Sequence, residues 1–220
     1  DLGVAAQLWR YLMRLVTLDL GFSAIYGKPV ATVILERLPP TILLMVSALS
    51  FAFFFGLVLG VVAARRVNRW PDTLISTLGL VFYATPSFWF GLMAIYLFSV
   101  RLGWLPSGGR QTLGQEFSLV DRLEHLLLPA TVLGFVLIAT WSRYTRASML
   151  EVINQDFIRV ARAKGLSERR IIISHGLRNA LGPLVVLAGI QIPLLFGGAL
   201  VTESVFTWPG MGRLFVDSLN

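Results

Sequence analysis

The chain has 220 residues, of which 55% are hydrophobic and only 14% are charged, and it contains no cysteine. A mean hydropathy of +0.72 and a charge content far below the ~25% of a soluble domain place it among membrane proteins. The formal net charge of +7 does not indicate a nucleic-acid partner, because the cations cluster between apolar segments, as topology determinants do. The lack of cysteine excludes disulfides and thiolate metal sites and leaves the redox compartment open.

Residues 1–40 are expected to form an external region with one amphipathic helix over 4–18. Apolar residues recur there every three or four positions, at Val4, Leu8, Leu12 and Leu15. Such a stripe can lie on a membrane surface or pack on other helices, and we favour packing. Residues 21–29 are expected to be a loop, and a short helix over 30–37 is predicted to end before two consecutive prolines.

Four uncharged stretches follow that can each cross a membrane. The predicted spans are 41–64, 73–100, 126–142 and 181–202. The first exceeds the roughly 20 residues that cross a hydrocarbon core of about 30 Å. Pro86, in the sequence YATPSFWF, predicts a kink or tilt in the second span, and Pro183 and Pro193 are expected to break the fourth. The tail after residue 203 has the glycines of a loop at the membrane face.

Lysine and arginine are denser in the loops after the first and third spans than on the opposite side. Their cations are Arg65, Arg66, Arg69, Arg143, Arg146, Arg159, Arg162, Lys164, Arg169, Arg170 and Arg178. The positive-inside rule therefore places these loops in the cytoplasm. Both Asp1 and Asn220 would then be external, and we expect a further spanning helix upstream, because no leader precedes Asp1.

The cytoplasmic loop 143–180 contains the polar stretch Asp156–Pro183, which is the largest surface that a soluble partner could contact. Its pattern predicts two short helices joined by a tight turn. A basic amphipathic helix over 154–164 would end at Gly165 in a left-handed conformation, and the Ser167 hydroxyl would cap the next helix.

This stretch resembles the coupling loop of ABC importer permeases. Only Ala161, Gly165 and Leu177 match the general Glu-Ala-Ala pattern. The version of the peptide/nickel subfamily, Y-x-R-T-A-R-A-K-G-L-S … H-x-L-R-N-A-L-x-P, matches far better, with Phe157 and Val160 in place of Tyr and Thr. The matching residues are Arg159, Ala161, Arg162, Ala163, Lys164, Gly165, Leu166, Ser167, His175, Leu177, Arg178, Asn179, Ala180, Leu181 and Pro183.

The resemblance extends over most of the chain. It includes DLGFS at 19–23, KPV at 28–30, ERLPPT at 36–41, ATPSFWFGL around Pro86, LGWLPSGG at 102–109 and VFTWPGMGRL at 205–214. The chain is similar to the first of the two permease subunits of a dipeptide, oligopeptide or nickel importer. This implies an all-α, polytopic helical bundle of the type I ABC importer permease kind. Such subunits have six spanning helices and four are predicted here, so we interpret the chain as a fragment; a natural four-helix protein is the alternative.

The resemblance also implies partners and a location. It implies a multi-pass protein in the lipid of a bacterial or archaeal cytoplasmic (inner) membrane, with a second homologous permease subunit, two cytoplasmic ABC ATPases and an extracytoplasmic solute-binding protein. The chain has no G-x-x-x-x-G-K-[ST] phosphate loop. We therefore expect no cofactor and no catalytic residue in this chain, with ATP and Mg in the ATPase. Peptide is the expected solute, and nickel, glutathione-like molecules and other small solutes stay open.

Residues Ser167–Ile173 are the hypothetical coupling helix, which would dock in a groove on the ATPase. Leu166 and Ile171 would be apolar anchors within a polar rim. The predicted coupling residues are Arg159, Ala161, Arg162, Lys164, Gly165, Leu166, Ser167, Glu168, Arg169, Arg170 and Ile171. His175, Arg178 and Asn179 are expected to support this unit. The alternative, which we favour for Arg65 and Arg66, is that the cations only set topology.

Polar or broken sites within spans tend to face a cavity, because they are costly in lipid. The candidates for lining a translocation pathway are Thr85, Pro86, Ser87, Gln191 and Pro193. Hydrogen bonding between helices is an equal alternative for each. The two histidines, His125 and His175, are predicted on opposite sides of the membrane and cannot form a metal site.

Two other classes of membrane protein can be compared with this pattern. An ion-coupled carrier or channel could also have kinked spans, but ion coupling ordinarily needs intramembrane charge, which the four spans lack. A membrane anchor that recruits a cytoplasmic enzyme would explain the polar loop but not the broken spans. An ATP-driven permease subunit is therefore the function that we expect.

Overall fold

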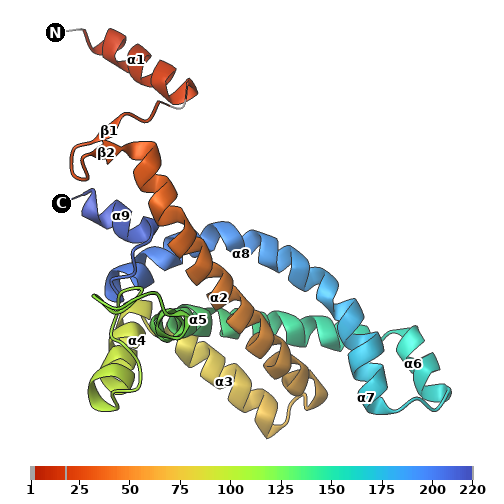
Figure 1. Ribbon diagram of the computed structural model, residues 1–220. Coiled ribbons are helices and arrows are strands. Elements are labelled where there is room, and N and C mark those ends of the chain that lie inside the picture. The colour runs from red at the N-terminus through yellow and green to blue at the C-terminus, as the bar shows by residue number, and fades with distance from the viewer. Residues whose placement is uncertain (1–2, 18, 220) are drawn as a thin grey trace.

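The computed structural model describes residues 3–17 and 19–219, and most of them are helical (Figure 1). Its frame consists of three long helices, α2 (Val30–Arg65), α5 (Leu119–Ile153) and α8 (Arg178–Val205). Among the described residues, three helical stretches are long and apolar enough to cross a membrane, and a bent helix pair would provide a fourth crossing. The fold is therefore that of a polytopic helical membrane protein.

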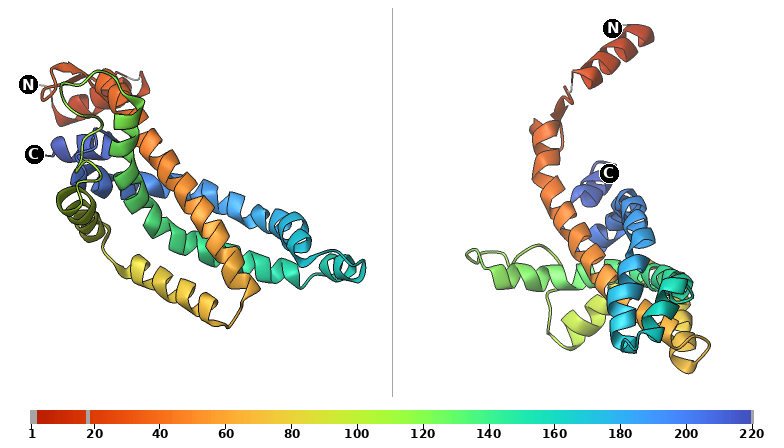
Figure 2. Two further views of the ribbon diagram at one scale, coloured as in Figure 1. Left: turned by 60° about the horizontal axis from the view of Figure 1, so that its bottom comes forward. Right: turned by 90° about the vertical axis from the view of Figure 1, so that its right-hand side faces the viewer.

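The bent pair follows α2 and includes the predicted kink. Helix α3 (Trp70–Ala84) ends two residues before Pro86, and α4 (Ser87–Ala94) begins directly after Pro86 and continues into the π-helical segment η1 (Ile95–Arg101). The two arms meet at 99°, and the sharp turn between them is visible in Figure 2. Proline disfavours a helical conformation in the residue before it and has no N–H to donate, so the helix is broken here rather than merely tilted.

Helix α2 begins at Val30, where the short helix was predicted to begin, and passes through Pro39 and Pro40 without ending. These prolines deprive the carbonyls of Leu35 and Glu36 of their helical donors. Both residues are exposed, so water can solvate the freed carbonyls. The expected end before the prolines was therefore wrong, and α2 extends from the external region into the first predicted span.

Helix α8 likewise contains Pro183 and Pro193, so the expected breaks in the fourth span were wrong. It is preceded without interruption by α7 (Glu168–Arg170) and the π-helical segment η2 (Ile171–Leu177). Membrane helices tolerate proline where π-type adjustments and neighbouring groups satisfy the freed carbonyls, and η2 ends less than two turns before Pro183. The second helix of the polar stretch is therefore the beginning of a long helix and not a short one.

Helices α2 and α5 pack closely along a stripe of small residues. The stripe repeats every four positions and is buried throughout: Ala48, Ala52, Gly56, Gly60 and Ala64. A Cβ atom added to Gly56 would overlap the Cβ of Trp141, and one added to Gly60 would overlap the Cβ of Thr145. This is the small-xxx-small pattern by which membrane helices approach each other, and it brings Trp141 into the centre of the bundle.

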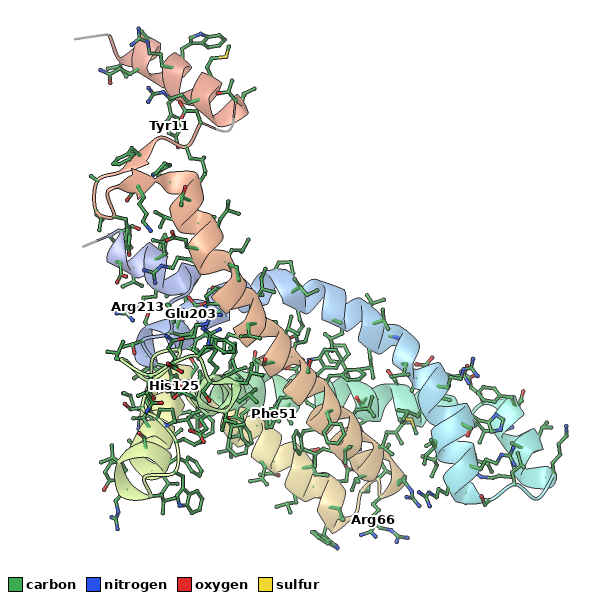
Figure 3. The ribbon with its side chains drawn as sticks, viewed as in Figure 1. Tyr11, Phe51, Arg66, His125, Glu203 and Arg213 are labelled. Atoms are coloured by element: carbon green, nitrogen blue, oxygen red, sulfur yellow. The ribbon has the colours of Figure 1, made fainter. Side chains whose placement is uncertain are left out.

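The end of the molecule where α2 begins and α8 ends is organised around one buried carboxylate, that of Glu203 (Figure 3). Glu203 is fully buried at the end of α8. Its Oε2 accepts hydrogen bonds from the N–H groups of Gly212 at 2.6 Å and Arg213 at 3.1 Å. Its Oε1 accepts one from the Thr41 hydroxyl at 2.6 Å. These N–H groups belong to the first turn of α9 (Met211–Asp217), so Glu203 joins α8, α2 and α9.

Part of the C-terminal tail that was expected to be a loop is therefore helical, because Glu203 satisfies the first amides of α9. A second long-range bond supports this corner, since Trp208 Nε1 donates to the carbonyl of Pro40 at 3.0 Å. The loop 21–29 contains a short antiparallel pair, β1 (Phe22–Ser23) and β2 (Lys28–Pro29). In the turn between these strands, the Tyr26 hydroxyl donates to Asp217 at 3.2 Å.

The N-terminal helix α1 (Val4–Val16) forms as its periodicity predicts. It stands apart from the other helices in Figure 2, and its apolar residues Leu8, Trp9 and Leu12 are exposed. The side chain of Leu15 lies outside the described part of the structure. Packing on other helices is therefore not seen among the described residues of this chain.

Candidate functional site

The polar stretch forms a compact unit at the end of the molecule away from Glu203, where α6 (Asp156–Ala163) and α7 meet (Figure 1). Gly165 has a φ of +75°, and its N–H donates to the Arg162 carbonyl at 2.9 Å. This confirms the predicted left-handed end of the first helix. Ser167 occupies the N-cap position of α7, as predicted, but its side chain makes no capping hydrogen bond.

The unit has a small apolar core of its own. Ile158, Ala161 and Ile171 are buried against one another, with Leu166 packed at the edge. Ile171 is completely buried, so its side chain is not available as a surface anchor for a partner. The expectation for Ile171 was therefore wrong in that respect, because the second helix turns this side chain towards α6. Ala161 is buried in the same core, on the face of α6 that packs against Ile171.

Charged side chains cover the outside of the unit. Arg162 Nε donates to Glu168 at 2.8 Å across the turn, and this hydrogen bond raises the pKa of Arg162 above its ordinary value. Arg159 pairs with Asp156 at 3.1 Å on the surface of α6. The exposed members of the predicted coupling set are Arg159, Arg162, Lys164, Gly165, Ser167, Glu168, Arg169 and Arg170.

Two exposed apolar residues of α6 were not among the predicted coupling residues. Phe157 and Val160 are 38% and 52% exposed, and they lie three positions apart, which places them on one face of the helix. The sequence could have identified them, because Phe157 and Val160 have the same three-residue spacing as the buried residues Ile158 and Ala161 and lie one position, or about 100°, away from them on the helix. The unit therefore presents an apolar pair beside its cations.

The predicted supporting residues lie where this unit joins α8. The side-chain amide of Asn179 donates to the His175 carbonyl at 2.6 Å. His175 is half-buried, whereas Arg178 and Asn179 are exposed. Beneath them, Met149, Ile172 and Ala180 belong to one buried cluster. The unit is thus packed directly on one end of the spanning helices.

An ion pair that the sequence did not indicate fixes the neighbouring ends of α3 and α5. Asp72 accepts from Arg146 Nε at 2.6 Å and from its Nη2 at 2.8 Å. The backbone N–H of Asn68 donates to the same carboxylate at 2.9 Å. Asp72 is buried, so this bidentate pair positions the two helices. The sequence predicted only a role in membrane topology for Arg146. The position of Asp72, an acidic residue next to a predicted span, could have indicated the pair.

A cavity of about 430 Å³ lies between the bent pair, α5 and α8. Its polar lining residues carry no charge: Tyr83, Ser87, Thr140, Tyr144 and Gln191. The structure therefore brings together two of the predicted pathway residues, Ser87 and Gln191. The Thr85 hydroxyl donates to the Val81 carbonyl at 2.8 Å in its own helix, and neither Thr85 nor Pro86 lines the cavity. Pro193 does not line it either, because two residues along a helix turn to nearly the opposite face.

The remaining candidates for chemistry do not converge. His125 lies near the start of α5 (Figure 3), with Nδ1 2.8 Å from the Asp121 carbonyl, whereas His175 belongs to the polar unit. Within the described ranges, no three metal-binding side chains lie close together.

Comparison with known proteins gives one consistent result. Residues 56–220 match the family described as "Binding-protein-dependent transport system inner membrane component". The oligopeptide transport system permease protein AppB of Bacillus subtilis (strain 168) is 46% identical over 213 residues, which are 96% of this chain and 67% of that protein. The glutathione transport system permease protein GsiC of Escherichia coli (strain K12) is 42% identical over 214 residues, 97% of this chain and 67% of that protein. The chain therefore belongs to the family of inner membrane components of binding-protein-dependent transport systems, and it is a multi-pass ABC permease subunit and not an enzyme.

Proposed function

We propose that this subunit lines the pathway by which an ATP-driven importer moves peptides across a bacterial cytoplasmic membrane, and that the polar unit receives the energy for it. The observation that carries the proposal is the uninterrupted helical path from Glu168 to Val205. One end of this path belongs to the exposed polar unit, and Gln191 lines the cavity farther along it. A partner that engages the first end is therefore mechanically connected to the second.

The solute class is proposed from the relatives and from the cavity. Both named relatives are permeases for peptides or for the peptide-like molecule glutathione. The cavity volume of about 430 Å³ lies within the ~300–1,000 Å³ range of small-molecule sites. Neutral hydroxyl and amide groups lie among aliphatic side chains in its lining, which suits an uncharged backbone of peptide groups with apolar side chains. A short peptide is therefore the solute that we propose.

The partner at the polar unit is proposed to be an ABC ATPase that binds ATP and Mg. Protein interfaces combine a buried apolar centre with a polar rim. Phe157 and Val160 would supply the apolar centre, and Arg159, Lys164 and Arg169 would supply part of the rim. We further propose two such ATPases, a second homologous permease and an extracytoplasmic solute-binding protein as the complete assembly.

The test of this function is the substitution Gly165→Val in the assembled transporter. The φ of +75° at Gly165 costs a β-branched side chain on the order of 1–2 kcal/mol, and this strain would misalign α6 against α7. We expect the variant to assemble with its partners, with ATP-dependent uptake of a labelled tripeptide into proteoliposomes reduced about tenfold.

The matched control is Gly114→Val, at a glycine with a φ of +81° and open space around it in the external loop. It imposes a similar backbone strain away from the polar unit and should retain uptake. Full uptake by Gly165→Val would refute the coupling role. If the wild-type assembly imported no peptide in the presence of ATP and the binding protein, the proposed import function itself would be wrong.

A further inference from the structure

The first N–H groups of α4 have no hydrogen-bond acceptor among the described residues. In an unbroken spanning helix, the carbonyls of the preceding turn would accept their hydrogen bonds. The first helical bond at this end is from Phe90 N–H to the Pro86 carbonyl at 3.1 Å. The N–H groups of Ser87, Phe88 and Trp89 therefore have no acceptor within the helix. No side chain caps this end. Because lipid supplies no acceptors, these donors require one from another source.

Ser87, the first residue of α4, also lines the cavity, and a second group there lacks a partner. Gln191 is only 8% exposed and lines the opposite wall on α8. Within the part of the chain that the structure describes, its amide makes no hydrogen bond. The same is true of the hydroxyls of Tyr83, Thr140 and Tyr144. Most of the other lining residues on α5 and α8 are aliphatic, so the Gln191 amide is a polar group that can bond a ligand in an otherwise largely apolar cavity.

The polarity of the site selects the kind of group. The N-terminus of a helix carries a partial positive charge and binds anions through its free N–H groups. Helical structure continues from Ser87 through η1 to Arg101, so this dipole extends beyond α4 itself. The Arg143 guanidinium, 5.7 Å from the centroid of the Tyr83 ring, adds a full positive charge beside the cavity. A cationic amino group would be repelled here, whereas a carboxylate would be stabilised.

We infer that this cavity binds the carboxylate of the transported peptide, with the α4 N-terminus and Ser87 on one side and the Gln191 amide on the other. This inference rests on the proposed function and adds to it the part of the solute that is recognised. Transporters with broken helices commonly direct a half-helix N-terminus at an anionic group of the substrate. Here the unbonded N–H and amide donors around the cavity would be available to a carboxylate, which only accepts hydrogen bonds.

The test compares two forms of one labelled tripeptide, with a free C-terminal carboxylate or with a C-terminal amide. Uptake of each is measured with the complete transporter and its binding protein in proteoliposomes. We expect Gln191→Leu to reduce uptake of the acid relative to the amide by about tenfold, which is the effect of losing one hydrogen bond to a charged group. The binding protein is the same in every sample, so its own preference cancels when variant and wild type are compared.

Two further variants keep the test decisive if Gln191→Leu does not fold. Gln191→Glu is nearly isosteric and places a negative charge in the cavity, so it should lower the acid-to-amide ratio still further. Ser87→Ala should lower this ratio in the same direction. The matched control is Thr85→Ala, which removes a hydroxyl that is bonded within its own helix and should leave the ratio unchanged.

The outcomes separate the two proposals. An unchanged acid-to-amide ratio in active Gln191 and Ser87 variants would overturn the carboxylate site. An equal loss of both peptides would also overturn it, because that result would indicate a structural role. Failure of the wild-type transporter to import either peptide would instead refute the proposed function.

Discussion

The close contact between α2 and α5 can be tested by one added methyl group, in the substitution Gly56→Ala. The new Cβ would overlap the Cβ of Trp141 and would lie 3.2 Å from the backbone N of Ser142. Trp141 is only 1% exposed, and its Cβ is attached to the backbone of α5, so no flexible side-chain end can move aside. The two helices must therefore separate locally.

The size of the effect follows from this geometry. Two carbon atoms in ordinary van der Waals contact are on the order of 1 Å farther apart than the added Cβ and the Cβ of Trp141 would be. Overpacking of this kind typically destabilises a protein by about 1–3 kcal/mol. For a chain of about 150–250 residues, each kcal/mol lowers Tm by about 2–4 °C. We therefore expect Gly56→Ala to lower Tm by about 2–12 °C.

The assay is thermal unfolding of the purified chain in detergent, with Gly79→Ala as the matched control. Gly79 lies on α3 and also faces α5, but a Cβ there would lie 3.5 Å from the Cβ of Ala139, which is an ordinary contact. The control should therefore unfold within a few degrees of wild type. Equal Tm values for Gly56→Ala and Gly79→Ala would show that α2 and α5 are farther apart than described.

Two buried polar groups give further predictions for the same assay. Glu203→Ala leaves the N–H groups of Gly212 and Arg213 without their charged acceptor and leaves the Thr41 hydroxyl only the Arg37 carbonyl at 3.5 Å, so the free energy of unfolding should fall by more than about 3 kcal/mol. A Tm near wild type would contradict this role. Asp72→Ala leaves Arg146 without its partner, and because the Arg146 side chain is 28% exposed, we expect a loss of about 2 kcal/mol, below the ~3–5 kcal/mol of a fully buried pair. Asp156→Ala, which removes an exposed ion pair, should change the free energy of unfolding by less than about 1 kcal/mol. An equal effect of Asp72→Ala and Asp156→Ala would refute the difference in strength between the partly buried and the exposed pair.

Features that depend on a few neighbouring residues could be predicted from the sequence. The left-handed turn at Gly165 follows from the glycine requirement at a helix end, and the break at Pro86 follows from the missing N–H. The spans were located by the length of uncharged sequence. The ends of the helices were not located in this way. Pro39 and Pro40 do not end α2, because the carbonyls that lose their hydrogen bonds there are exposed to water.

Features that depend on distant contacts could not be predicted in this way. Glu203 and Thr41 are far apart in the chain and meet only because α2 and α8 converge in the folded protein. Ile171 looked like a surface anchor because the sequence does not show which face of α7 and η2 packs on α6. The stripe that includes Gly56 and Gly60 was different, because its four-residue repeat is visible in the sequence and could have identified the face of α2 that contacts α5.

The uninterrupted helical path from the polar unit into α8 has a mechanical consequence. At about 1.5 Å per residue, the segment from Glu168 to Gln191 is roughly 35 Å long. A tilt of only about 5° at one end of such a lever arm would displace the other end by about 3 Å. That displacement is close to the length of one hydrogen bond, so a slight rocking of α7 would suffice to engage or release a solute held by Gln191.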